Sequence, residues 1–135
     1  MIQIAYEHLR RGKFPEARHA LSRAIDEDDS HWGIYLGLAK VNEGELEDKE
    51  AIKNYKKAME LGGGTEAEYH YGAYLFNHGE FDKSCATFAN VVENKNYERR
   101  SSAFHSLAQC EEKRGNTAKS IEHLNKAAVL DSNNY

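Results

Sequence analysis

Four glycines at nearly regular spacing constrain the fold of this chain more than any other feature. Gly12, Gly44, Gly79 and Gly115 each end an apolar stretch with helical periodicity, and they are 32, 35 and 36 residues apart. A second stretch of helical periodicity follows each glycine. Two helical stretches in every repeating unit are typical of helical repeat proteins. The sequence therefore predicts an all-α chain of eight helices in four antiparallel pairs, with turns at Gly12, Gly44 to Asp48, Gly79 and Gly115.

The second helix of each pair carries small or apolar residues at fixed offsets from its turn. These residues are Ala17, Leu21 and Ala24 in the first repeat, Ser84, Phe88 and Val91 in the third, and Ser120, Leu124 and Ala127 in the fourth. In the second repeat they are Ala51, Tyr55 and Ala58, two residues later than Gly44 would place them. We interpret this shift as a two-residue insertion in the turn "ELEDKE".

A small residue lies seven positions before each turn glycine. These positions hold Ala5, Gly37, Gly72 and Ala108. Because a glycine inside a helix costs roughly 1 kcal/mol relative to alanine, Gly37 and Gly72 indicate close helix packing, where a larger side chain would overpack the core.

The residue two positions after each turn glycine gives a further prediction. Phe14, Leu46 and Phe81 hold this position in the first three repeats. We expect these three side chains to fill the corner of their helix hairpins.

Together these features resemble the tetratricopeptide repeat. The family pattern is a large residue followed by Gly or Ala in the first helix, a glycine turn, and then Ala, an aromatic residue or Leu, and Ala in the second. The resemblance implies one domain, a right-handed superhelix of antiparallel helix pairs. Its four repeats cover approximately residues 1–29, 30–64, 65–100 and 101–135.

Proteins of this repeat class bind partners in a groove lined by the first helix of each repeat. In the register set by the four glycines, the groove is unusually apolar, and contiguous apolar patches mark interaction sites. The predicted binding residues are Tyr6, Leu9, Ile34, Leu38, Val41, Tyr69, Phe76, Asn77 and His105. The alternative is that part of this set belongs to the core, because a shift in register exchanges core and groove positions.

The chemistry of these positions narrows the partner. A groove that captures a C-terminal carboxylate needs Lys, Arg and Asn facing inward, whereas Ile34, Leu38 and Tyr69 hold those positions in the predicted register. We therefore expect an extended or helical apolar segment of another protein to bind in the groove.

The second half of the chain is similar to a narrower family, the type IV pilus pilotins PilF and PilW. The matching residues are Tyr71, Gly72, Tyr74 and Leu75 in a first helix, followed by Tyr97, Arg99 and Arg100 in the long link "ENKNYERRS". The resemblance implies a non-catalytic factor that helps an outer-membrane secretin to assemble, with a secretin subunit as the partner. That family has about six repeats, a signal peptide and a lipidated cysteine, and this sequence shows four repeats and neither of the other two features.

The remaining residues offer no catalytic or metal-binding pattern. The seven histidines include no pair at i and i+4 and no His-Glu-x-x-His motif, and "DEDD" lacks the spacing of a calcium loop. We therefore expect no enzyme activity, no cofactor and no metal. Cys85 and Cys110 fall on neighbouring helices, where we expect small buried packing residues, and the sequence leaves open whether they pair.

Composition leaves two function classes open. The net charge of −4, with Lys and Arg scattered along the chain, argues against a nucleic-acid partner, and no apolar run reaches the length of a membrane span. The first hypothesis is a pilotin-like assembly factor, which would be periplasmic or associated with the outer membrane. The second is a generic cytoplasmic tetratricopeptide adaptor or regulatory domain, including a fragment of a larger protein or enzyme. A homo-oligomer is compatible with both.

Overall fold

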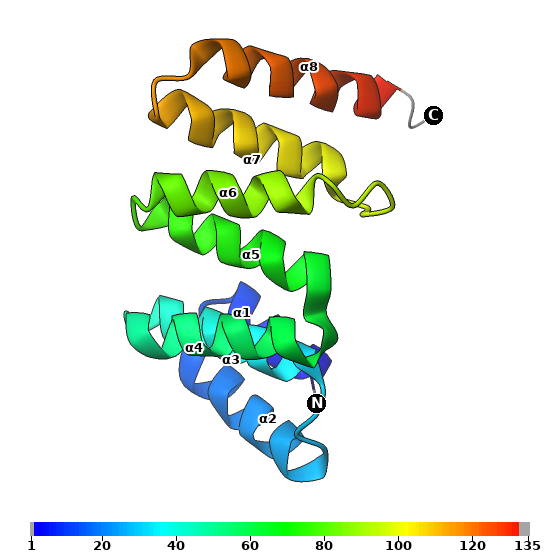
Figure 1. Cartoon of the computed structure of the whole chain (residues 1–135). Coiled ribbons are helices and arrows are strands. Elements are labelled where there is room, and N and C mark those ends of the chain that lie inside the picture. Colours follow the sequence, from blue (N-terminus) through cyan, green and yellow to red (C-terminus); the bar gives the residue numbers. More distant parts are fainter. Residues whose placement is uncertain (1, 133–135) are drawn as a thin grey trace. The chain divides into compact units, whose positions relative to one another are not determined.

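The computed structural model describes residues 2–132, and within them the chain forms eight α-helices and no strand. The helices are α1 (Ile2–Arg10), α2 (Phe14–Glu27), α3 (Trp32–Gly44), α4 (Asp48–Ala58), α5 (Gly64–Asn77), α6 (Phe81–Val91), α7 (Arg100–Lys113) and α8 (Thr117–Ser132). A π-helical segment, η1 (Met59–Gly63), joins α4 to α5. The predicted all-α fold of antiparallel helix pairs is confirmed (Figure 1).

The chain divides into two compact units, Met1–Ala67 and Glu68–Tyr135, which we describe separately. In the first unit, α2 packs on α1 and α3, and α3 packs on α4. In the second unit, α6, α7 and α8 lie side by side in chain order (Figure 1). The assignment of the whole chain to one domain stays a prediction.

Three of the four hairpin turns lie at the predicted glycines. Gly12, Gly79 and Gly115 have φ angles of 71°, 75° and 83°, a left-handed conformation that glycine adopts without steric cost. In each of these turns the next helix begins two residues later. Pro15 lies in the first turn of α2, where a missing backbone N–H leaves no helical hydrogen bond unmade.

The second turn corrects the interpretation of an insertion. Its left-handed residue is Leu46, with φ of 61°, whereas Gly44 is still helical. Counted from Leu46, the turn has the same length as the others, and Ala51 lies five residues on, as Ala17 follows Gly12. No residue is inserted, and the register of the second repeat is two residues later than the glycine pattern predicts.

This shift changes the repeat positions that the two glycines Gly37 and Gly44 of α3 hold. Ala39, and not Gly37, lies seven residues before the left-handed position, and it is fully buried. Gly44 packs against the ring of Phe14, whose atoms occupy the space that a Cβ would need. Leu46 does not fill the hairpin corner as predicted, because its side chain is 83% exposed.

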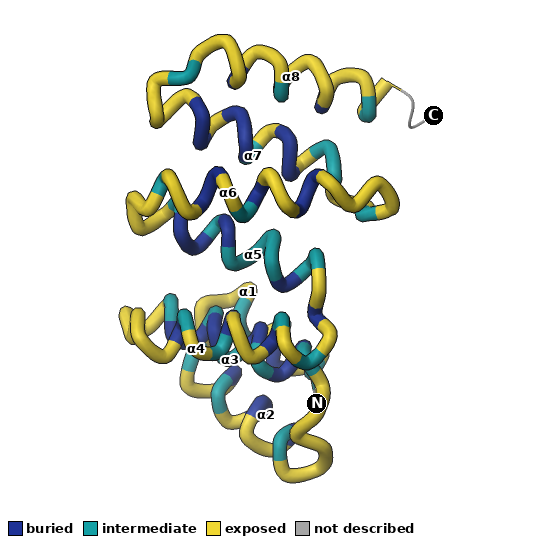
Figure 2. Tube along the Cα trace, viewed as in Figure 1, coloured by how far each residue is buried: buried dark blue, intermediate teal, exposed yellow. Residues whose placement is uncertain are grey.

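Each unit has its own hydrophobic core, seen as the dark segments of the helices in Figure 2. The core of the first unit includes Ala5, Ala17, Ala20, Leu21, Ala24, Ile34 and Val41. The core of the second includes Cys85, Phe88, Val91, Val92, Ala103, Phe104, Leu107, Cys110 and Ala127. Small residues dominate the first core, as close packing of helix pairs requires.

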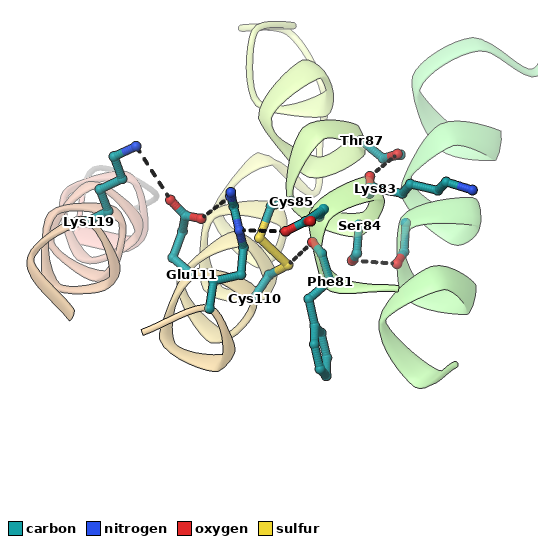
Figure 3. Close-up of a disulfide and its surroundings, with 11 residues drawn as sticks. Phe81, Lys83, Ser84, Cys85, Thr87, Cys110, Glu111 and Lys119 are labelled. Atoms are coloured by element: carbon teal, nitrogen blue, oxygen red, sulfur yellow. Dashed lines mark hydrogen bonds and ion pairs between the residues drawn. A yellow bond between two sulfur atoms is a disulfide. The ribbon is translucent and has the colours of Figure 1, made fainter. Parts of the chain in front are cut away.

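Cys85 and Cys110 form a disulfide that links α6 to α7, a pairing that the sequence left open (Figure 3). Their Cα atoms are 5.6 Å apart, within the usual range of about 4.4–6.8 Å. Both residues are buried in the core of the second unit. The sequence placed them on adjacent helices but could not give the distance between their side chains.

Candidate protein-interaction surface

The predicted binding residues of the first unit separate into core and half-buried positions. Ile34 and Val41 are 1% and 0% exposed and belong to the core, so a bound segment cannot reach them in this structure. Leu9 and Leu38 are half-buried and pack against the same core. The two core positions follow from the register of the second repeat.

With Leu46 as the reference, the positions equivalent to Tyr69 and Phe76 in the second repeat are Leu36 and Glu43, and not Ile34 and Val41. Lys40 replaces Leu38 in the same way. The groove positions of this repeat are therefore more polar than the sequence predicted. The exclusion of a carboxylate-binding groove now depends on Tyr69 and Leu36, because Leu36 takes the place of Ile34 while Lys40 takes that of Leu38.

Tyr6 is held by a backbone contact within the first unit. Its hydroxyl donates a hydrogen bond of 2.7 Å to the carbonyl oxygen of Gly33. Burial raises the pKa of the Tyr6 phenol, and the Glu66 carboxylate raises it further. The neutral, hydrogen-bonded form of Tyr6 therefore ties α1 to the start of α3.

In the second unit, Tyr69 is the centre of an aromatic cluster. Its ring meets Phe88 edge-on, with ring centroids 5.8 Å apart, and lies 6.0 Å from the ring of Tyr97. The guanidinium of Arg99 lies over the Tyr69 ring at 5.7 Å, a distance at which the cation is attracted to the ring face. Tyr97 and Arg99 belong to the link between α6 and α7. The sequence of this link resembles that of the pilotins, but neither residue was predicted to belong to a binding surface.

Phe76 extends this cluster along α5. It lies two helical turns after Tyr69, with Ala73 between them, so the three residues share one face of the helix. The Phe76 ring meets Phe81 edge-on at 5.3 Å. Tyr69, Ala73 and Phe76 are all half-buried against the core of the second unit.

We call Tyr69, Ala73, Phe76, Tyr97 and Arg99 the Tyr69 surface. Two predicted residues lie outside it. Asn77 is exposed at the end of α5, and His105 is exposed on α7, with its Nε2 atom 3.9 Å from Asp131. The structure brings Tyr69 and Phe76 together, and adds the two link residues to them.

Hydrogen bonds to backbone carbonyl oxygens hold the link in shape. The side chain of Arg100 donates a hydrogen bond of 2.8 Å to the carbonyl oxygen of Val92, from one end of the link to the other. The Tyr97 N–H donates to the Asn94 carbonyl oxygen at 3.2 Å. These bonds position Tyr97 and Arg99 before any partner binds.

A charged network lies beside the disulfide (Figure 3). The buried Glu111 carboxylate accepts a hydrogen bond of 3.0 Å from Arg114 and lies 4.0 Å from the Lys119 ammonium group. Arg114 also pairs with Asp82 of α6 at 3.0 Å. A buried carboxylate is costly unless it is paired. The contacts with Arg114 and Lys119 therefore explain how Glu111 can be buried.

Between residues 2 and 132, no group of three or more His, Cys, Asp or Glu side chains could hold a metal ion. None of the helices formed by these residues is long and apolar enough to cross a membrane.

Comparison with known proteins identifies the repeat. Residues 2–64 match the family model of the tetratricopeptide repeat. Over 98% of its length, the chain is 25% identical to the type IV pilus assembly protein PilF of Pseudomonas aeruginosa, and it covers 53% of that protein. The chain therefore spans about half the length of this relative.

Solved structures agree with this result. The structure of PilF from Pseudomonas aeruginosa matches 98% of this chain with a TM-score of 0.90 and 25% identity, and 60% of that protein is covered. PilW, a type IV pilus biogenesis factor, matches 96% of the chain with a TM-score of 0.85 and 18% identity, again with 60% of that protein covered. MamA matches 98% of the chain with a TM-score of 0.82 and 20% identity, with 77% covered.

Tetratricopeptide repeat proteins bind protein partners, and those similar to this chain are generally scaffolds without catalytic activity. The repeat pattern, the helix pairs and the matched structures all lead to one conclusion. The chain carries a tetratricopeptide repeat region at residues 2–64, a protein-interaction module, and over nearly its whole length it is similar to PilF and PilW.

Proposed function

We propose that this chain is a type IV pilus assembly factor that binds a segment of a partner protein on the Tyr69 surface. One observation carries the proposal: the link residues Tyr97 and Arg99 pack on Tyr69. A generic tetratricopeptide repeat does not need this long link. It occurs here in a chain that is similar to PilF over nearly its whole length.

The side chains of the Tyr69 surface suit a protein partner. Tyrosine and arginine are enriched among the residues that dominate binding energy at interfaces, and they work best where neighbouring groups exclude water. Tyr69, Phe76 and Tyr97 are half-buried and keep part of each ring accessible. An apolar segment can cover these rings while the exposed Asn77 amide bonds to its backbone.

The pilus resemblance names the partner as a subunit of an outer-membrane secretin, with the chain in the periplasm or at the outer membrane. The disulfide between Cys85 and Cys110 supports this location. Disulfides persist in the bacterial periplasm and are rare in the cytosol, where thiols are kept reduced. The alternative, a cytoplasmic adaptor, would keep both cysteines reduced.

The test is direct binding of the purified secretin subunit from the same cells to the 135-residue chain. Truncating a buried aromatic anchor commonly costs about 2 kcal/mol or more of binding energy, so Tyr69→Ala and Phe76→Ala should each weaken binding at least about tenfold. Arg99→Glu is an exposed change that should also weaken binding. Leu46→Ala, exposed in a turn of the other unit, is the matched control and should bind like the parent.

Two outcomes would overturn the proposal. A parent chain that fails to bind the secretin subunit removes the pilus assignment and favours the generic adaptor. Variants that stay helical by circular dichroism and bind as tightly as the parent would show that the partner binds elsewhere. Arg99→Glu keeps the test informative if either aromatic variant loses its fold.

A further inference from the structure

Helix α8 exposes an apolar face. Ile121 and Val129 are 54% and 58% exposed, and most of α8 is exposed in Figure 2. No helix formed by residues 2–132 covers these side chains. An amphipathic helix usually buries its apolar face against another element. The exposed face of α8 is therefore suited to packing against another protein surface.

The repeat register shows which surface fits this face. Counted from the left-handed turn residue, Ile121 and Ala128 in α8 correspond to Cys85 in α6 and to Val92 directly after it. Cys85 and Val92 are buried in the core that α6 forms with α7. The exposed face of α8 is therefore the same face by which α6 packs on the following helix pair.

The matching receiving surface is exposed on the first repeat. A pocket of about 430 Å³ lies between α1 and α2, lined by Ile4, His8, Pro15, Glu16, His19, Ala20 and Arg23. Ile4 is 53% exposed. The residues that line this pocket again have equivalents in the fourth repeat.

In the register, Ile4 corresponds to Leu107, His8 to Glu111, and Ala20 to His123. Six of the seven lining residues have their equivalents in a pocket of about 640 Å³ on α7 and α8. One wall of that larger pocket is α6. The first repeat thus presents a surface equivalent to the one that lies beside α6 on the fourth repeat, and no helix formed by residues 2–132 borders it in the way that α6 does.

We propose that α8 of one copy of this chain docks on the α1–α2 face of a second copy, as α6 docks on α7 within one chain. The occupant is a second copy because one chain carries both halves of an interface that it already forms internally. The centre of the contact is uncharged, with Ile121, Ala128 and Val129 meeting Ile4 and Ala20. This self-association is independent of the binding function proposed for the Tyr69 surface.

Such a contact joins two different surfaces, so it is heterologous. Heterologous contacts leave one free copy of each surface on every assembly, and they extend unless the rotation closes a ring. The mass of the assemblies should therefore rise with protein concentration.

Sedimentation velocity of the 135-residue chain over a wide concentration range tests the proposal. The parent should shift from monomer to dimers and larger assemblies as concentration rises. Ile4→Glu blocks the α1–α2 face and Ile121→Glu blocks α8, so each variant alone should stay monomeric. An equal mixture of the two should form a one-to-one dimer and nothing larger, because each variant keeps the surface that the other lacks.

Leu46→Glu, at an exposed turn position, is the matched control and should assemble like the parent. Circular dichroism checks that every variant keeps its helices, and His19→Glu and Val129→Glu, also at exposed positions, replace a variant that does not. A parent that stays monomeric at every concentration would overturn the proposal. So would a mixture that stays monomeric, or an Ile4→Glu variant that still dimerises, which would indicate pairing between two α8 faces.

Discussion

The hydroxyl group of Ser84 donates a buried hydrogen bond of 2.9 Å to the carbonyl oxygen of Gly72, and the ring of Phe88 packs over the same glycine. A Cβ atom added to Gly72 would lie 3.0 Å from two atoms of that ring. Helices α5 and α6 therefore meet at Gly72 through contacts made by two residues of α6. Their separation leaves no space for a larger residue in α5.

Gly72→Leu should lower the free energy of unfolding by about 1–3 kcal/mol, because a leucine must displace the Phe88 ring or separate the helices. Urea unfolding followed by circular dichroism measures the change. Ala89→Leu adds the same side chain at an exposed position of α6 and should leave the midpoint nearly unchanged. Equal midpoints for Gly72→Leu and the parent would mean that the contact with Phe88 is not tight.

Leu46→Gly should stabilise the fold. Leu46 adopts a left-handed backbone with φ of 61° and is 83% exposed, so its side chain adds strain and little packing. The left-handed conformation costs a non-glycine residue roughly 1–2 kcal/mol, and the greater freedom of glycine in the unfolded chain offsets about 0.4–1 kcal/mol of the gain. The net rise in the free energy of unfolding should be up to about 1.6 kcal/mol.

The control for this turn is Leu46→Ala, which keeps a Cβ atom and should change stability little. Both variants are compared with the parent by urea unfolding. A Leu46→Gly variant that is less stable than Leu46→Ala would show that the turn does not hold Leu46 in the left-handed region.

Replacing both Cys85 and Cys110 with alanine should destabilise the oxidised chain. The disulfide joins residues 25 positions apart, and closing a loop of this size stabilises a fold by about 3.5 kcal/mol in the chain-entropy model. Chemical unfolding with and without a reducing agent measures the effect. The reductant should lower the stability of the parent and leave the double variant unchanged.

Thiol labelling of the unfolded chain provides the independent check. The oxidised parent should bind no alkylating reagent until a reductant is added. Labelling of both cysteines in the parent purified and unfolded without reductant would contradict the disulfide.

Tyr6→Phe should alter how stability depends on alkaline pH. Burial raises the pKa of Tyr6 in the folded state, so the unfolded chain loses this proton first, near pH 10. The stability linked to the protonated phenol is complete below that pH and is lost as the pH rises toward the folded-state pKa. The parent should therefore lose stability more steeply above pH 10 than Tyr6→Phe does.

At neutral pH the same variant should be about 0.5–1.5 kcal/mol less stable, because the hydrogen bond to the Gly33 carbonyl is lost. Urea midpoints of the two chains are compared at pH 7 and 9, below the pKa of a phenol in the unfolded chain, and at pH 10.5, above it. Identical pH profiles for parent and variant would show that Tyr6 does not titrate differently in the folded state.

The repeat pattern, the helix pairs and the positions of the four turns could be predicted from the sequence, because they depend on local chemistry. Glycine at Gly12, Gly79 and Gly115 marks a left-handed turn, and the apolar period on either side marks a helix. The same logic failed where the chemistry was unusual. Leu46 holds the left-handed position in the second turn. Because the register was counted from the nearby Gly44, it was wrong by two residues.

A signal for the correct register was present in the second helix. Ala51 holds the place of Ala17 only if the turn is counted from Leu46. The shift of two residues decides whether Ile34 and Val41 face the core or a groove. Because residues two apart lie on nearly opposite sides of a helix, a small error in register reversed this part of the predicted binding surface.

The sequence by itself determined an all-helical repeat chain and its resemblance to the pilotins, since periodicity and turn residues are local properties. Tertiary structure alone decided the pairing of Cys85 with Cys110 and the packing of Tyr97 and Arg99 on Tyr69. Such contacts join residues that are about 25 to 30 positions apart in the sequence. Their geometry depends on how closely the helices approach, which small residues such as Gly72 permit but sequence spacing does not measure.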